Sequence, residues 1–317
     1  MDVAILDDYQ GAALRFGDWD SVRALADVSA FSDHLADEAD LVDRLQDAEI
    51  VVAMRERTPF ARTLLGRLPN LRLLVTTGMR NAAIDMEAAR DAGVTVCGTS
   101  GLGYPTAELT WGLILALLRR IPREHAAVQA GAWQVDLGEG LQGKTLGLLG
   151  LGRLGSQVAR VGRAFEMEVV AWSENLTSAR TAEVGVRLAA SKEDLLERSD
   201  IATIHLVLSD RTRGLIGARE LERMPSTSYL INTSRGPIVE ESALVEALRS
   251  GSIAGAALDV FDEEPLPAAH PLLGLDNVVL TPHVGYVTKE SYEVFFNDVV
   301  ANILAFLADD PVRVLNG

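Results

Sequence analysis

The sequence is poor in cysteine and in basic residues, and each shortage excludes a class of protein. Its single cysteine, Cys97, excludes an intrachain disulfide and a cysteine-based metal site, which favours a reducing, cytoplasmic location. Lys and Arg number 29 against 45 Asp and Glu, so the net charge is −16. This charge disfavours binding to nucleic acid or to anionic membranes. An anionic small substrate would need locally placed arginines.

Long hydrophobic runs are also absent. The apolar stretch 111–118 is far shorter than the ~20 residues of a membrane span. The chain begins Met1-Asp2, with an acid where a secretory signal needs a base, so we expect no export signal. At roughly 150 residues per domain, 317 residues with 48% apolar content predict two domains, each with its own core.

Short apolar runs alternate with stretches whose apolar residues lie three and four positions apart. This alternation predicts an α/β fold with parallel sheets covered by helices on both faces. A helical, strand-free stretch at 104–132, interrupted by Pro122, separates two groups of strands and contains the predicted domain boundary. After residue 281 only helical spacing remains. The predicted strands are residues 3–6, 50–54, 71–76, 94–97, 145–149, 168–172, 201–205, 229–232, 254–259 and 278–281.

A glycine-rich turn connects predicted strand 145–149 to a helix. It reads Gly150-Leu151-Gly152-Arg153-Leu154-Gly155, the GxGxxG pattern of a dinucleotide-binding site. The first glycine permits the tight turn, the second lets the backbone approach a pyrophosphate, and the third lets helix and strand pack closely. The helix N-terminus offers free N–H groups to the phosphates. We therefore predict that this turn, including Arg153 and Leu154, binds the cofactor.

The cofactor's ribose is expected near the end of the next strand, 168–172. Glu174 lies 19 positions after Gly155, where an acid hydrogen-bonds a ribose 2′-hydroxyl and repels a 2′-phosphate. No arginine is adjacent to it in the sequence, so NAD is favoured over NADP. Ser173 immediately precedes Glu174 and is included in the predicted cofactor site.

Three later segments place chemically active side chains after predicted strands, at the sheet edge where α/β proteins bind ligands. They are Asn232-Thr233-Ser234-Arg235-Gly236, the stretch from Asp259 to Glu264-Pro265, and Thr281-Pro282-His283-Val284-Gly285. With the glycine-rich turn, these motifs resemble the D-isomer-specific 2-hydroxyacid dehydrogenase family over essentially the whole chain.

The resemblance implies a specific organisation and specific roles. Arg235, Glu264 and His283 would be the catalytic residues, Asp259 would hold the nicotinamide carboxamide, and Thr233 would lie near the cofactor. Residues 101–285 would form a Rossmann-type dinucleotide-binding domain inserted in a substrate domain made of 1–100 plus 286–317. The resemblance also implies homodimers formed through the cofactor domain.

Elementary chemistry supports the same catalytic roles. Reduction of a 2-oxo acid needs a proton at the carbonyl oxygen, and histidine is suited to supply it near neutral pH. A neighbouring carboxylate, Glu264, would orient the His283 ring and favour its charged form. The guanidinium of Arg235 can grip a carboxylate with two parallel hydrogen bonds. No metal is needed for hydride transfer.

Two segments depart from the family pattern. The substrate loop of the first domain carries Gly78-Met79-Arg80, with Arg80 in place of a small residue. Arg80 is either a second anion contact for the substrate or a solvent-facing side chain. His205 is expected to line the cofactor pocket without catalysing, and Val207 stands where the family commonly has proline.

We predict an NAD-dependent oxidoreductase that interconverts a small anionic 2-oxo acid and a D-2-hydroxy acid. Formate dehydrogenases on this fold carry glutamine in place of Glu264, whereas phosphite dehydrogenases share the same three catalytic residue types. A phosphite-type dehydrogenase is therefore one alternative. A non-catalytic NADH-sensing binding module, as in the C-terminal-binding-protein corepressors, is the other.

Overall fold

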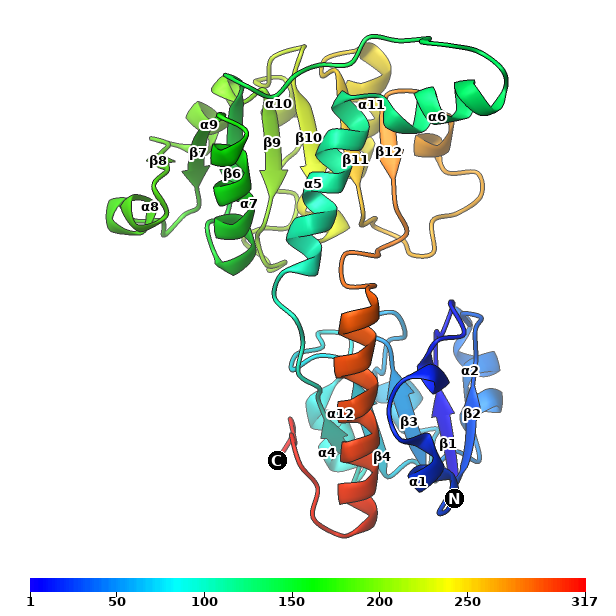
Figure 1. Cartoon of the computed structure of the whole chain (residues 1–317). Helices are drawn as coiled ribbons and strands as arrows, with labels where there is room; N and C mark the ends of the chain where they lie inside the picture. The colour runs from blue at the N-terminus through cyan, green and yellow to red at the C-terminus, as the bar shows by residue number, and fades with distance from the viewer. The chain divides into compact units, whose positions relative to one another are not determined.

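The computed structural model describes residues 1–317, which divide into two compact units (Figure 1). Unit 1 comprises Met1–Leu102 and Val287–Gly317, and unit 2 comprises Gly103–Tyr286. Each unit contains one parallel sheet with helices on both faces, which is the α/β architecture that the sequence predicts. None of the helices combines the length and the apolar character needed to cross a membrane.

Unit 1 has five parallel strands in the order β2-β1-β3-β4-β5. The strands are β1 (Asp2–Ile5), β2 (Asp27–Ala30), β3 (Ile50–Ala53), β4 (Leu73–Thr76) and β5 (Thr95–Cys97). The helices are α1 (Trp19–Arg23), α2 (Glu38–Leu45), α3 (Arg62–Leu65), α4 (Met86–Asp91) and α12 (Lys289–Leu307), with a 3₁₀ helix at Ala13–Arg15. This strand order is one of the two common doubly wound arrangements.

The two faces of the unit 1 sheet are covered by different helices. Apolar residues of α2, α3 and α4 form one core with the sheet, around the fully buried Phe60. On the other face α1 and α12 pack together, and the ring centroids of Trp19 and Phe296 lie 6.4 Å apart. Since α12 follows unit 2 in the chain, unit 1 is completed only by a segment that returns from beyond residue 286 (Figure 1).

Unit 2 has seven parallel strands in the order β12-β11-β10-β9-β6-β7-β8. The strands are β6 (Thr145–Leu149), β7 (Glu168–Trp172), β8 (Arg187–Leu188), β9 (Ile201–Ile204), β10 (Tyr229–Asn232), β11 (Gly255–Leu258) and β12 (Val278–Leu280). The helices are α5 (Pro105–Leu118), α6 (Ile121–Gln129), α7 (Arg153–Ala164), α8 (Ser178–Val184), α9 (Lys192–Arg198), α10 (Ala218–Leu221) and α11 (Glu241–Ser250), with 3₁₀ helices at Gly236–Ile238 and Pro271–Gly274.

Strand β6 lies inside the unit 2 sheet, with β7 on one side and β9 on the other. The chain order of the strands reverses there, which is the switch point at which Rossmann folds bind dinucleotides. Helices α5 and α7 cover one face, and α9, α10 and α11 cover the other (Figure 1). Strand β6 is therefore packed between two apolar cores, one on each face of the sheet, and the turn that follows it starts from a fixed position.

The structure confirms the ten predicted strands and adds two that the sequence pattern missed. Strands β2 and β8 lie at sheet edges and are mostly exposed, so neither carries the apolar run by which a buried strand is recognised. The predicted break at Pro122 is confirmed: α5 ends at Leu118, Arg120 adopts a φ of 53°, and α6 begins at Ile121. Ser191 caps α9, since its side chain accepts a hydrogen bond from the Asp194 amide.

Candidate active site

The glycine-rich turn after β6 lies at the switch point of the unit 2 sheet. Gly150 has a φ of 104°, and a Cβ there would lie 2.6 Å from the carbonyl oxygen of His205. A Cβ on Gly155 would lie 2.1 Å from the carbonyl oxygen of Gly150, so only glycine lets α7 begin this close to the strand. A Cβ on Gly152 would meet nothing within 4 Å. The first and third glycines therefore serve packing, and the second borders open space into which a pyrophosphate fits.

The first turn of α7 suits an anion. Gly152 caps the helix, no acidic residue lies in its first turn, and Arg153 is exposed while Leu154 is half-buried. Backbone N–H groups at such an N-terminus have no partner within the helix and attract phosphate. The residues present therefore fit the pyrophosphate of NAD.

At the end of β7 the structure corrects one premise of the sequence interpretation. Ser173 is half-buried and Glu174 is exposed. No arginine is near Glu174 in the sequence, but Arg211, which follows β9, places its Nη1 3.4 Å from Oε2 of Glu174. The sequence missed this arginine because the two residues lie 37 positions apart. The local charge at the predicted ribose site is therefore more nearly balanced than Glu174 alone suggests.

His205 follows β9 and lies next to the glycine-rich turn. Its Nε2 is 3.1 Å from the hydroxyl of Thr203, and burial lowers the pKa of the His205 imidazole from 6.5 to about 4. The ring is therefore neutral at pH 7. A neutral ring supports the expectation that His205 lines the cofactor site without donating protons.

Arg235 is presented by a tight turn after β10. The side chain of Asn232 braces this turn: its Nδ2 donates to the Arg235 carbonyl at 2.9 Å, and its Oδ1 accepts from the Ser234 amide at 3.0 Å. Arg235 is half-buried and donates from Nη1 to the Ser234 carbonyl at 2.7 Å. A Cβ on Gly236 would lie 2.1 Å from the carbonyl of Phe261. The Arg235 turn therefore packs directly against the segment that leads to Glu264.

Thr233, in the same turn, is buried, and its hydroxyl is hydrogen-bonded within the protein. Its hydroxyl lies 2.8 Å from the hydroxyl of Thr110 on α5. This contact ties the turn after β10 to the helix that covers β10 and β11.

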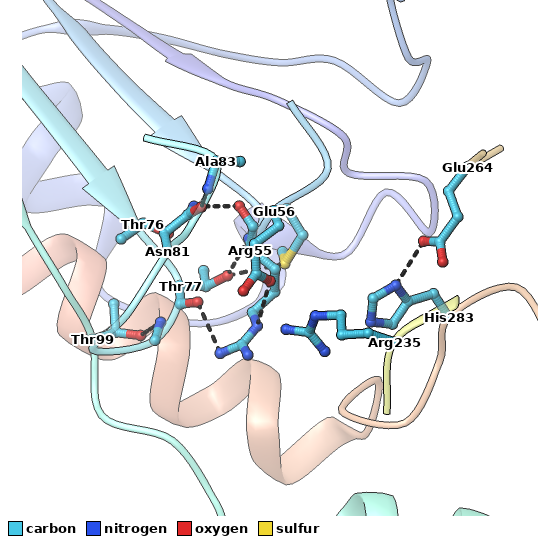
Figure 2. A network of polar contacts seen from close by, with 12 residues as sticks. Arg55, Glu56, Thr76, Thr77, Asn81, Ala83, Thr99, Arg235, Glu264 and His283 are labelled. Carbon is cyan, nitrogen blue, oxygen red and sulfur yellow. Dashed lines mark hydrogen bonds and ion pairs between the residues drawn. The ribbon is translucent and has the colours of Figure 1, made fainter. Parts of the chain in front are cut away.

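Glu264 and His283 meet, as the resemblance implies. Oε2 of Glu264 lies 2.6 Å from Nδ1 of His283, and Oε1 accepts the Phe261 amide at 2.9 Å (Figure 2). The ring of Tyr286 stands edge-on to the imidazole, with centroids 5.9 Å apart. Because Nδ1 is engaged, Nε2 is the ring nitrogen left to exchange a proton with a ligand. In Figure 2 the side chains of Arg235 and His283 extend from their loops in the same direction.

Asp259 is almost completely buried, and its carboxylate is occupied by the loop that carries His283. It accepts hydrogen bonds from the Thr281 hydroxyl at 2.6 Å and from the amides of Val284 and Gly285, each at 2.8 Å. Burial raises the pKa of the Asp259 carboxyl, although these three donors oppose the shift. His283 itself adopts a φ of 52°. The contacts observed in the protein thus make Asp259 a brace for the histidine loop.

In unit 1, a polar network shapes the loop that carries Gly78, Met79 and Arg80 (Figure 2). The Nδ2 of Asn81 donates to the Arg55 carbonyl at 2.6 Å and to the Thr76 hydroxyl at 2.8 Å. Gly78 has a φ of 110°, and its amide donates to the Thr99 hydroxyl at 2.7 Å. Met79 and Arg80 are exposed at the tip of this braced loop.

Sequence reasoning overlooked the residues that brace these loops. Arg55 lies two residues after the end of β3, and its guanidinium donates to the Thr77 carbonyl at 3.3 Å. The signal was present, because Arg55 stands just after a predicted strand in the same way as Arg235 does. Asn81 and Tyr286 offered no such signal, since their partners are distant in the sequence or depend on ring orientation.

Comparison with known proteins agrees with this geometry. Residues 111–285, more than half of the chain, match the family model described as D-isomer specific 2-hydroxyacid dehydrogenase, NAD binding domain. A glyoxylate reductase of Aeropyrum pernix is 45% identical over 253 residues, which cover 77% of this chain and 75% of the relative. A D-3-phosphoglycerate dehydrogenase of Methanocaldococcus jannaschii is 37% identical over 255 residues, but the match spans only 48% of its length.

A solved structure resembles the chain over almost its full length. The phosphoglycerate oxidoreductase from Vibrio cholerae o395 has a TM-score of 0.93 and 38% identity, and the match covers 98% of this chain and 99% of that one. Together with the family match, the fold defines an NAD-dependent oxidoreductase acting on CH–OH donors, with a Rossmann-type cofactor domain. The chain belongs to the D-isomer-specific 2-hydroxyacid dehydrogenase family.

Proposed function

We propose that the protein interconverts a 2-oxo acid and the corresponding D-2-hydroxy acid, with His283 as the acid/base, Glu264 as its partner and Arg235 as the substrate carboxylate ligand. The observation that carries this proposal is the 2.6 Å contact between Nδ1 of His283 and Oε2 of Glu264. A histidine oriented by a carboxylate in an NAD-binding unit is suited to move a proton to or from a carbinol oxygen.

The residues of the chain supply three functions. Glu264, held by the Phe261 amide, fixes the His283 ring so that Nε2 presents a proton to the substrate's carbonyl oxygen. Arg235 binds the substrate carboxylate and draws electron density from the adjacent carbonyl. The chemistry that NADH supplies, when bound, is hydride donation to the carbonyl carbon. In the oxidative direction His283 accepts the hydroxyl proton.

We assign the dinucleotide to residues 101–285 and a substrate-binding role to residues 1–100 plus 286–317. In the second region the loop of Gly78, Met79 and Arg80 is the candidate contact, because its tip is exposed while its base is fixed by Asn81 and Thr99. Thr233 and Asp259 are assigned to the nicotinamide end of the cofactor site, and Asp259 has the additional bracing contacts described above.

The test is NADH oxidation with a panel of 2-oxo acids, including glyoxylate and hydroxypyruvate, together with NAD reduction by phosphite. We expect turnover on at least one 2-oxo acid. His283→Gln should lower kcat by about 10²- to 10⁴-fold, and Arg235→Gln should mainly raise KM. NADH binding, measured by quenching of tryptophan fluorescence, should survive both substitutions.

The panel also separates the alternatives. Turnover of phosphite alone would make the protein a phosphite-type dehydrogenase. NADH binding without turnover of any compound would contradict the enzymatic proposal and favour a nucleotide-sensing binding module.

We further propose a homodimer formed through unit 2 and a cytoplasmic location. Apolar side chains on and after α6 are strongly exposed, among them Trp133 at 77% and Leu137 at 90%. A surface of this kind is typical of an interface with another protein chain. Light scattering should give the mass of a dimer, and Leu137→Asp should shift it towards the monomer. The matched control is Leu25→Asp in unit 1, also an exposed leucine at 60%. Cell fractionation tests the location.

A further inference from the structure

We infer that the cofactor site accepts NADPH as well as NADH, and that Arg211 is the residue that binds the 2′-phosphate. An acid after the second strand of a Rossmann unit normally favours NAD, because it bonds the ribose 2′-hydroxyl and repels a phosphate there. In this chain the acid, Glu174, lies 3.4 Å from the guanidinium of Arg211. A ribose 2′ substituent that contacts Glu174 would therefore also lie close to the positive charge of Arg211.

The position of Arg211 follows from the topology of the sheet. Glu174 follows β7 and Arg211 follows β9, and these two strands flank β6 on opposite sides. The segment after β9 therefore reaches across the carboxyl end of β6, close to the glycine-rich turn. Within that segment the Thr212 hydroxyl accepts the Ser209 amide at 2.8 Å and donates to the Val207 carbonyl at 2.7 Å. Arg211 thus projects from a hydrogen-bonded turn.

The ion pair between Arg211 and Glu174 is weak enough for Arg211 to leave Glu174 and bind a ligand instead. The two side chains are 73% and 65% exposed, so solvent screens their attraction. Glu174 is the one partner of Arg211 in the structure. A 2′-phosphate carries more charge than a carboxylate and offers several acceptor oxygens for the guanidinium fork. We therefore expect Arg211 to move from Glu174 to the phosphate when NADPH binds, and to remain near Glu174 when NADH binds.

The surroundings of the pair favour a phosphate further. Ser173, the last residue before Glu174, has a hydroxyl that can donate to a phosphate and has no charge to repel it. Arg180 on α8 lies against the glycine-rich turn and α7, with Nη2 donating to the Ser156 hydroxyl at 2.8 Å and Nε to the Leu151 carbonyl at 3.4 Å, while Nη1 pairs with Glu183 at 2.9 Å. These contacts keep Arg180 with its protein partners, so Arg211 is the arginine that supplies the movable contact.

The experiment measures the dissociation constants of NADH and NADPH by calorimetry, without any 2-oxo acid. For the unmodified protein we expect the two values to agree within about tenfold. Arg211→Gln should weaken NADPH binding by about tenfold or more and leave NADH binding within about twofold. Glu174→Gln should strengthen NADPH binding and weaken NADH binding, because it removes the repulsion and the ribose ligand together.

The matched control is Arg223→Gln, which removes the same charge from another exposed Arg–Glu pair of unit 2, that with Glu197. It should leave both dissociation constants unchanged. The inference is overturned if NADPH binds more than about tenfold more weakly than NADH, or if Arg211→Gln affects NADPH no more than Arg223→Gln does. Since the readout is nucleotide binding alone, a protein that reduces no 2-oxo acid would refute the proposed function and leave this inference standing.

Discussion

Asp259 and His283 are joined through the backbone: the Asp259 carboxylate accepts the amides of Val284 and Gly285, the two residues that follow the histidine. The Thr281 hydroxyl, two residues before His283, donates to the same carboxylate. One buried side chain therefore holds the loop on both sides of the histidine. The position of Nε2 depends on a residue from a different strand end.

Asp259→Asn tests this relationship. The amide group replaces one acceptor oxygen with a donor that faces a backbone N–H, so the loop must shift. We expect kcat to fall by about 10- to 100-fold, because small displacements of a catalytic group are costly. Thr281→Val removes one of the three donors to Asp259, and it should lower kcat by less than about tenfold. If Asp259→Asn kept the full kcat, the bracing would be irrelevant to catalysis.

Substitutions of Glu264 separate its orienting role from its charge. Glutamine at this position can still accept the hydrogen bond from His283 Nδ1, whereas alanine cannot. We expect Glu264→Gln to lower kcat by about tenfold and Glu264→Ala by about 100-fold. Steady-state kinetics on the preferred 2-oxo acid decide this. Equal losses in the two variants would mean that the charge matters and the orientation does not.

Two glycines of the same turn should respond differently to the same substitution. Gly155→Ala places a Cβ against the Gly150 carbonyl and should lower the free energy of unfolding by about 1–3 kcal/mol. Gly152→Ala meets no protein atom, so its stability should match the unmodified protein while its affinity for NADH falls. Thermal unfolding and nucleotide titration of both variants provide the comparison. Equal stability of the two variants would contradict this division of roles.

The neutral imidazole of His205 predicts a pH dependence of stability. Burial lowers its pKa from 6.5 to about 4 in the folded protein, so between these values the unfolded chain binds the extra proton. The free energy of unfolding should therefore fall as the pH drops from about 6.5 to about 4, by roughly 3 kcal/mol at most from this residue. Denaturant unfolding at several pH values should show a smaller fall for His205→Gln.

His125→Gln is the control for that measurement, since His125 is exposed on α6. Its stability should follow the unmodified protein at every pH. Parallel curves for His205→Gln and His125→Gln would show that His205 is protonated equally in both states.

The sequence predicted most of this fold because buried parallel strands leave a clear pattern. Strand β6 is apolar and buried after Thr145, and it is followed by glycines whose spacing has a steric reason, so strand, turn and helix were all predictable. Strand β2 has no buried residue, and its place beside β1 depends on tertiary pairing that a local pattern does not contain.

The sequence identified the motif residues of the site better than it identified the side chains that these residues contact. The His283–Glu264 contact was expected from a family resemblance, since spacing alone does not bring residues 19 positions apart together. Arg211 beside Glu174 and Asp259 beneath the histidine loop could not be derived in that way. Both contacts join the ends of different strands. The ends of β11 and β12 are neighbours in the sheet, whereas those of β7 and β9 lie on either side of β6.

The return of α12 to unit 1 has a consequence for synthesis on the ribosome. Residues 1–102 are translated before unit 2, but α12, which packs on one face of their sheet, is translated after it. Unit 2 is continuous in the chain and can finish folding earlier. Residues 1–102 must therefore wait for residues 287–307 before both faces of their sheet are covered, and the apolar face that α12 covers stays exposed during that interval.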